Sequence, residues 1–193
     1  MVRSPAMSDT TSEQDRERRT KRIRHLSRWM ATGCLATSWL LAAGMVLYWT
    51  TTPTHTLFSQ AGIPSSSVTE IGFFVRGVAF GVSMVPLGAL IYGLLSARRC
   101  FDLFAAGQIF CREPIKRLKG FAVGIAASAL LKPFAGAALS VLLSFNNPAG
   151  AKALTLSVDS DTLIALLFAG TVAAIAWIMA EALDIADENR QFV

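Results

Sequence analysis

Two positively charged side chains, Lys132 and Arg76, lie inside or at the edge of long apolar segments, where a charge can bind a ligand or carry a proton. Lys132 is 12 residues after Gly120 and 13 before Phe145. At about 1.5 Å per residue, roughly 18 Å of helix separates it from either end of its segment. A lysine at that depth must find polar partners, lose its proton or distort the bilayer. Pro133 beside it removes a backbone donor and so frees a carbonyl.

These cations allow two interpretations. Ser128, one helical turn before Lys132, could help to form a polar pocket for an anionic or polar ligand. Alternatively, Lys132 is a structural lysine whose amine is satisfied by neighbouring helices. Arg76 lies near the outer end of its segment, where it can extend towards Glu70 or a lipid headgroup. The sequence thus predicts a candidate intramembrane site of Lys132, Ser128 and Arg76, with further hydroxyls at matching depth on Ser83, Thr37 and Thr171.

Other reactive residue types lack the spacing that catalysis or metal binding requires. The sequence contains no zinc-protease, nucleophile-elbow, phosphate-loop or dinucleotide motif. No apolar segment carries a pair of carboxylates, which disfavours an acidic proton relay. We therefore expect no enzyme activity, no metal and no cofactor. The histidines and cysteines are expected to be surface or structural residues: His25, His55, Cys34, Cys100 and Cys111.

The composition indicates a membrane protein. Of 193 residues, 53% are hydrophobic and only 16% are charged, whereas soluble domains have about 25% charged residues. Four apolar stretches match the roughly 20 residues needed to cross a hydrocarbon core, and within lipid only helices satisfy the backbone of such segments. We predict an all-α, four-transmembrane-helix bundle at residues 28–193, with spans at about 29–50, 71–97, 119–145 and 162–182.

The basic residues predict the orientation of these spans. Eight of the 18 Lys and Arg residues precede the first span, and six lie between the second and the third. The loop at 51–69 has none, and that at 146–161 has only Lys152. Because basic loops stay in the cytoplasm, we expect both termini and the middle loop to be cytoplasmic. The same asymmetry favours a basic cytoplasmic anchor at residues 1–27 over a nucleic-acid-binding arm.

The N-terminal region resembles two kinds of targeting signal, and the sequence disfavours both. The first apolar run is too long for a signal peptide and ends in Tyr48-Trp49-Thr50 without a small-residue cleavage site. Ala31-Thr32-Gly33-Cys34 resembles a lipoprotein box but follows Arg28 too closely for an apolar core to precede it. We expect the first span to stay attached.

The connection between the second and third spans, residues 98–118, is predicted to be a stiff hairpin. Gly107 can end the first helix in a left-handed conformation, and Pro114, next to Glu113, suits the first turn of the next helix. The last span continues into an acidic helix end at 183–193, which we expect to lie near the hairpin. The two regions form a candidate cytoplasmic interaction surface: Arg98, Arg99, Arg112, Lys116, Arg117, Lys119, Asp184, Asp187 and Glu188.

Small residues predict where the helices pack. The second span carries Gly77-x-x-x-Gly81 and the third carries Gly120-x-x-x-Gly124, a spacing that permits close helix approach. The row in the third span continues through Ser128, then Gly136, Ser140 and Ser144, and Lys132 occupies the one remaining place in it. Outside the membrane, alternation over residues 154–158 indicates a short strand.

The chain resembles a bacterial four-span family known as domain of unknown function 2975 (DUF2975). The resemblance rests on the hairpin segment 101–110, on Ile115-Lys116-Arg117-Leu118, and on Asp187-Glu188-Asn189-Arg190 near the end. It extends over about residues 30–193 and implies a bacterial inner-membrane location. The family has no established activity, but some members are encoded beside a small helix-turn-helix regulator. Such a regulator is therefore a candidate partner.

The sequence leaves two functions open. The favoured one is a non-enzymatic inner-membrane protein that acts through protein partners, as a regulator or scaffold, with no direct contact to nucleic acid. The alternative is a small transporter or ligand sensor centred on Lys132, which a four-span chain would form as a homo-oligomer.

Overall fold

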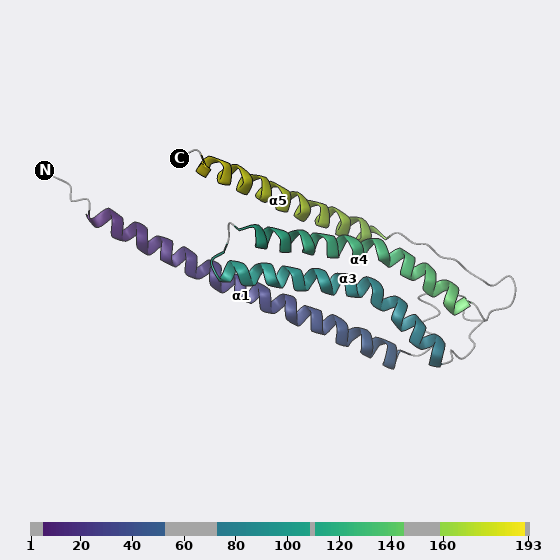
Figure 1. Cartoon of the computed structure of the whole chain (residues 1–193). Helices are drawn as coiled ribbons and strands as arrows, with labels where there is room; N and C mark the ends of the chain where they lie inside the picture. Colours follow the sequence, from purple (N-terminus) through teal and green to yellow (C-terminus); the bar gives the residue numbers. More distant parts are fainter. Residues whose placement is uncertain (1–5, 53–72, 109–110, 145–158, 192–193) are drawn as a thin grey trace.

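The computed structural model describes residues 6–52, 73–108, 111–144 and 159–191 (Figure 1). Within these ranges the chain forms α1 (Ala6–Thr51), α3 (Phe73–Ala105), α4 (Arg112–Ser144) and α5 (Ser160–Gln191). Each of the four contains a stretch long and apolar enough to cross a membrane. The predicted all-α four-helix transmembrane fold is therefore confirmed. The strand expected at 154–158 lies outside the described residues.

The helices extend beyond the apolar stretches that predicted them. Helix α1 has 46 residues, about 69 Å at 1.5 Å per residue, which is more than twice the thickness of a hydrocarbon core. It begins at Ala6, so the basic N-terminal segment continues the first span as one helix. Helix α5 continues to Gln191. Hydropathy locates the part of each helix that lies in lipid, but not the helix ends.

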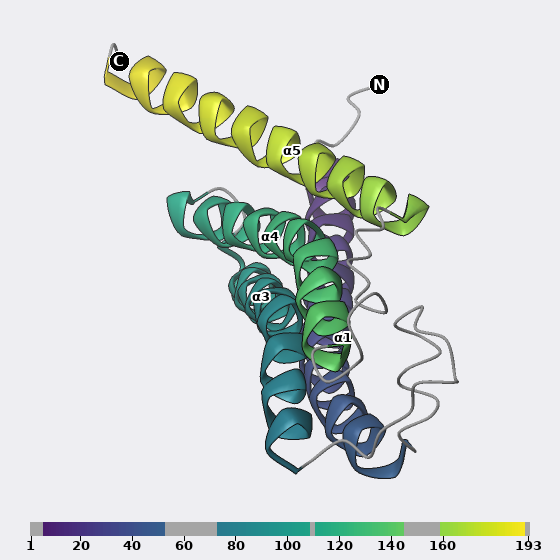
Figure 2. The same ribbon diagram turned by 90° about the vertical axis from the view of Figure 1, so that its right-hand side faces the viewer.

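Consecutive helices pack against one another. The main contacts are those of α1 with α3, α3 with α4, and α4 with α5. The N-terminal end of α1, the end of α3, the start of α4 and the C-terminal end of α5 all lie at one end of the molecule (Figure 1). Helix α5 crosses the others obliquely, and its C-terminal part extends away from them (Figure 2). The basic hairpin and the acidic helix end therefore share one end of the molecule.

The closest helix approach is between α3 and α4. A Cβ atom built on Gly124 would lie 2.5 Å from the Cα of Gly93 and 2.9 Å from the carbonyl oxygen of Ala89. At Gly120 the nearest atom would be the hydroxyl of Ser96, at 3.2 Å. The prediction that the glycine row of the third span lies at a helix seam is confirmed at these two positions. It is wrong at Gly136, which is exposed and, among the described residues, has nothing within 4 Å of a Cβ built on it.

The other glycine pair does not lie at this seam. Among the described residues, nothing comes within 4 Å of a Cβ built on Gly77 or Gly81, and both glycines are exposed. The interpretation of this pair as a close helix contact is wrong within the described part of the chain. The glycine of α3 that packs against Gly124 is instead Gly93, four residues after Ala89.

The end of the bundle opposite the termini has a small core of residues from three helices. Trp49 of α1 and Ala79 of α3 are buried and pack together. Leu139 and Leu142 of α4 pack against the pair. Many large apolar side chains elsewhere are exposed, including Leu167 at 74% and Trp177 at 68%. An exposed apolar exterior of this kind is what a lipid-facing surface requires.

Candidate functional site

The hairpin between α3 and α4 begins with a turn that ends α3. Gly107 has φ +86°, the left-handed conformation that glycine adopts readily. Its amide donates to the carbonyl of Phe104, and the amide of Gln108 donates to that of Leu103, both at 3.0 Å. This pair of hydrogen bonds is the Schellman motif, which satisfies carbonyls at a helix C-terminus. The predicted stop at Gly107 is confirmed.

The next helix starts with Arg112, Glu113 and Pro114. Pro114 is fully buried and lies in the first turn, where a missing amide costs no helical hydrogen bond. Cys100, also buried, donates its thiol to the carbonyl of Pro114 at 3.4 Å. Ile115 is buried as well. The end of α3 and the start of α4 therefore pack against each other through Cys100 and Pro114, and the stiffness of the hairpin stays a prediction.

Three of the six cations in or beside the hairpin form ion pairs with described residues. Arg98 lies 3.8 Å from Asp102, and Arg117 lies 2.7 Å from Glu113, each one helical turn away. Arg112 forms the third ion pair, which joins it to α5. The other cations form no ion pair with any described residue. This leaves three cations at the surface without a carboxylate partner in the described part of the chain: Arg99, Lys116 and Lys119.

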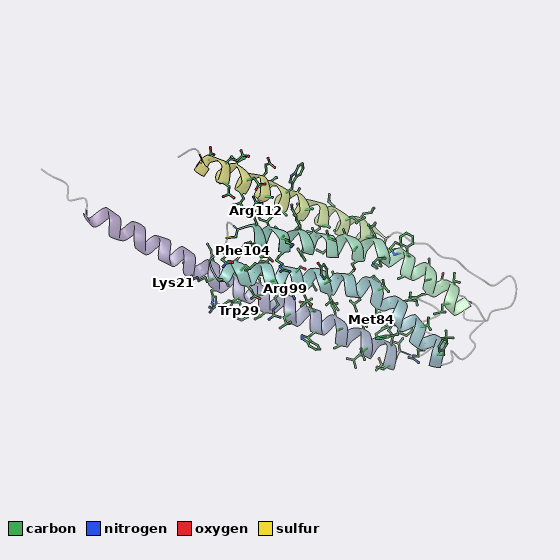
Figure 3. All side chains as sticks on the ribbon, viewed as in Figure 1. Lys21, Trp29, Met84, Arg99, Phe104 and Arg112 are labelled. Atoms are coloured by element: carbon green, nitrogen blue, oxygen red, sulfur yellow. The ribbon has the colours of Figure 1, made fainter. Side chains whose placement is uncertain are left out.

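An ion pair joins the hairpin to the acidic end of α5. The guanidinium of Arg112 donates to Oδ1 of Asp184 at 2.9 Å, although 72 residues separate the two. Arg112, the first residue of α4, lies on the side towards α5, and Arg99 and Phe104 lie at the same end of the molecule (Figure 3). The predicted proximity of hairpin and acidic tail is thus confirmed. Both side chains are more than half exposed, so the pair contributes only about 0–1 kcal/mol.

The rest of the acidic helix end follows Asp184 on α5. Asp187 is half-buried and Glu188 is exposed. The carboxylates of Asp187 and Glu188 therefore lie about one helical turn beyond Asp184, towards the C-terminus. We call the combined charged region the clasp surface: Arg98, Arg99, Arg112, Lys116, Arg117, Lys119, Asp184, Asp187 and Glu188.

The residues of the candidate intramembrane site are divided between two helices: Lys132 and Ser128 lie on α4, whereas Arg76 lies near the start of α3. Lys132 is exposed on α4, and Ser128, one turn before it, is half-buried. Ser83 and Thr171, two of the proposed pocket hydroxyls, each donate to a carbonyl of their own helix. A polar site around Lys132 stays a prediction, and it would require another molecule to cover the exposed face of α4.

Arg76 has a structural role at the opposite end of the bundle. Its Nε donates to the carbonyl of Trp49 at 2.9 Å, and its NH2 group donates to that of Thr52 at 2.7 Å. Carbonyls at a helix C-terminus lack intrahelical donors, and a cation there also interacts favourably with the helix dipole. Arg76 thus ties the start of α3 to the end of α1.

We expect Arg76→Met to destabilise the protein by about 1–3 kcal/mol, because half-buried carbonyls lose charge-assisted hydrogen bonds. Thermal unfolding in detergent measures this effect. Arg22→Met is the matched control, since Arg22 is an exposed cation on α1, and it should change stability by less than about 0.5 kcal/mol. Equal melting temperatures for the two variants would contradict the capping role.

The histidine and cysteines show no clustering suited to a metal. Within the described residues, no group of three or more His, Cys, Asp and Glu side chains could hold a metal ion. His25 accepts a hydrogen bond from the indole of Trp29 at 2.9 Å. Cys34 is half-buried and Cys111 exposed. His55 lies outside the described residues.

Sequence reasoning missed the lining of two cavities between α4 and α5. Ala122 and Ala126 of α4 line one of them, as do Ala169 and Ala173 of α5. The pattern that could have revealed them is the repeat of small residues four positions apart on both helices, which resembles a helix-packing motif.

No family model, no curated protein and no solved structure matches this chain. The resemblance carried by the hairpin and the C-terminal segment therefore stays a prediction.

Proposed function

We propose that this four-span membrane protein is a non-enzymatic regulator or scaffold of the bacterial inner membrane, and that protein partners bind its clasp surface in the cytoplasm. The observation that carries the proposal is the ion pair between Arg112 and Asp184. It brings two charged segments, distant in sequence, together at the end of the molecule where the helices extend furthest beyond their apolar stretches.

The distribution of charge supports the cytoplasmic orientation. Eight basic residues precede the first span and six lie in or beside the hairpin. The N-terminal end of α1 and the hairpin lie at the same end of the bundle (Figure 1), so their charges act together in the positive-inside rule.

The clasp surface suits a protein partner better than nucleic acid. It combines cations that form no ion pair with any described residue with the carboxylates of Asp187 and Glu188, and carboxylates repel a phosphate backbone. Complementary mixed charge favours specific protein association and raises its rate. A small helix-turn-helix regulator, the partner that the family resemblance implies, is the first candidate.

Crosslinking in intact cells, followed by identification of co-purifying proteins, tests this function. We expect a specific partner with the native chain, and its loss in the charge-reversal variant Arg99→Glu/Asp187→Lys, which preserves net charge. The matched control is Arg22→Glu/Glu181→Lys, in which both altered residues are exposed, lie towards the same end of the bundle and are outside the clasp surface. A partner retained by the first variant, or lost equally from both, would contradict the proposed surface.

The exposed position of Lys132 midway along α4 favours a second candidate function. A cation at this depth needs a polar partner, so a homo-oligomer could enclose it in a transporter or ligand-sensor site. Lys132→Leu distinguishes the two functions. It should leave partner crosslinking intact if the clasp surface acts alone. If Lys132 binds a ligand, the variant should instead remove any growth difference between cells with and without the native protein, although folded protein is still present.

A further inference from the structure

Two cavities adjoin each other along the contact between α4 and α5. The first has a volume of about 280 Å³ and lies at the charged end of the molecule, between Arg112, Lys116 and Asp184. The second has a volume of about 510 Å³ and continues along the two helices. Lys119 lines both, so the two cavities are neighbours along α4.

The first cavity carries an excess of positive charge. Its lining contains three cations, Arg112, Lys116 and Lys119, and one carboxylate, that of Asp184. Asp184 pairs with Arg112, whereas neither lysine forms an ion pair with any described residue. Two ammonium groups are therefore free to bind an anion at this place.

The second cavity is an apolar groove with a floor of small residues. Ala122 of α4 and Ala169 of α5 are buried there. Val123 and Trp177 line its sides and are 63% and 68% exposed. The groove is therefore open laterally, towards the surface that faces lipid.

The length of the groove corresponds to one leaflet of a bilayer. It extends along α5 from Trp177 to Leu166, which is about 16 Å at 1.5 Å per residue. The hydrocarbon core is about 30 Å thick, so one leaflet takes up about half of it. The charged cavity lies beyond Trp177, at the end of the groove nearer the C-terminus of α5.

We propose that the two cavities together bind one anionic phospholipid. The headgroup phosphate lies between Lys116, Lys119 and Arg112, and one acyl chain follows the groove past Ala169. Cations of this kind bind phosphate oxygens through charge-assisted hydrogen bonds, and basic pockets between helices on the cytoplasmic side suit acidic headgroups. The lipid would join α5 to α4, its main contact in the bundle. The site goes beyond the proposed function, because a lipid can occupy it without any protein partner.

Native mass spectrometry of the purified full-length protein in detergent tests the site. The probes are phosphatidylglycerol and phosphatidylcholine with identical acyl chains. Each lysine near an anionic headgroup strengthens binding about fivefold. We therefore expect phosphatidylglycerol to bind more tightly, and Lys116→Gln/Lys119→Gln to weaken it about 25-fold. The control Arg22→Gln/Arg28→Gln removes two exposed cations from α1 and should leave binding unchanged.

A second pair of variants tests the acyl chain. Ala173→Phe places a ring in the groove and should weaken binding of phosphatidylglycerol, whereas Ala174→Phe, at an exposed neighbour outside the lining, should not. Equal binding of the two lipids, or an equal loss in both charge variants, would overturn the site. Full displacement by inorganic phosphate would show a phosphate site instead, and normal binding by Ala173→Phe would remove the acyl chain from the groove.

Discussion

Replacing Gly124 with leucine is expected to push α3 and α4 apart and to destabilise the protein by about 3 kcal/mol or more. Even a Cβ atom at this position would lie 2.5 Å from the Cα and 2.7 Å from the backbone nitrogen of Gly93. Carbon atoms in contact prefer about 3.5–4.0 Å, and backbone atoms cannot move aside as the end of a flexible side chain can. The helices must therefore separate by about 1 Å.

A separation of that size affects the most extensive helix contact of the bundle, that of α3 with α4. A gap of 0.5–1 Å forfeits about a quarter to a half of the dispersion energy of each atom pair. In lipid, where apolar burial drives helix association only weakly, dispersion is a main source of stability. We thus expect a graded series in thermal unfolding, in which Gly124→Ala is less stable than the parent and Gly124→Leu less stable again.

Gly136 supplies the matched control on the same helix. It is exposed, and among the described residues nothing lies within 4 Å of a Cβ built on it. Gly136→Ala and Gly136→Leu should leave the melting temperature unchanged or raise it, because glycine disfavours the helix. Identical melting of Gly124→Leu and Gly136→Leu would contradict the close crossing.

Replacing Gly107 with valine is the second change with a large expected effect, of about 1–3 kcal/mol. The strain comes from φ +86°, which a β-branched side chain tolerates poorly. Crowding is not the cause, since a Cβ there would lie 3.7 Å from the NH2 group of Arg24, an ordinary contact. The two Schellman hydrogen bonds that close α3 depend on this conformation.

A comparison of three substitutions at Gly107 isolates the backbone effect. Asparagine adopts the left-handed conformation more readily than other non-glycine residues, so Gly107→Asn should be the most stable variant. Gly107→Ala should be intermediate, and Gly107→Val the least stable. Thermal unfolding in detergent ranks them. If valine and asparagine gave the same stability, the backbone conformation at Gly107 would not control the hairpin.

The sequence predicted those features that depend on local chemistry. Apolar length located the four spans, and the conformational preferences of Gly107 and Pro114 predicted the turn. These signals succeed because membrane insertion and helix termination depend on nearby residues. The extension of α1 back to Ala6 was less apparent, because hydropathy does not describe a helix beyond the lipid.

Features that depend on how two helices cross could not be predicted as well. Gly77 and Gly81 have the same spacing as Gly120 and Gly124, yet only the second pair lies at the seam between α3 and α4 within the described residues. The partner of Gly124 is Gly93, which depends on the register of two helices. Arg76 similarly binds carbonyls of α1, and no local pattern names the end of another helix as its partner.

The central claim is that the charged end of this bundle lies in the cytoplasm, since the partner surface and the lipid site both depend on it. Paired reporter fusions, one type active only outside the inner membrane and one only inside, test it directly. Fusions after Val193 and within residues 105–112 should report cytoplasm, and fusions at Pro64 and Gly150 should report the outer side. An externally active reporter at the C-terminus, or a cytoplasmic one at Gly150, would contradict this topology.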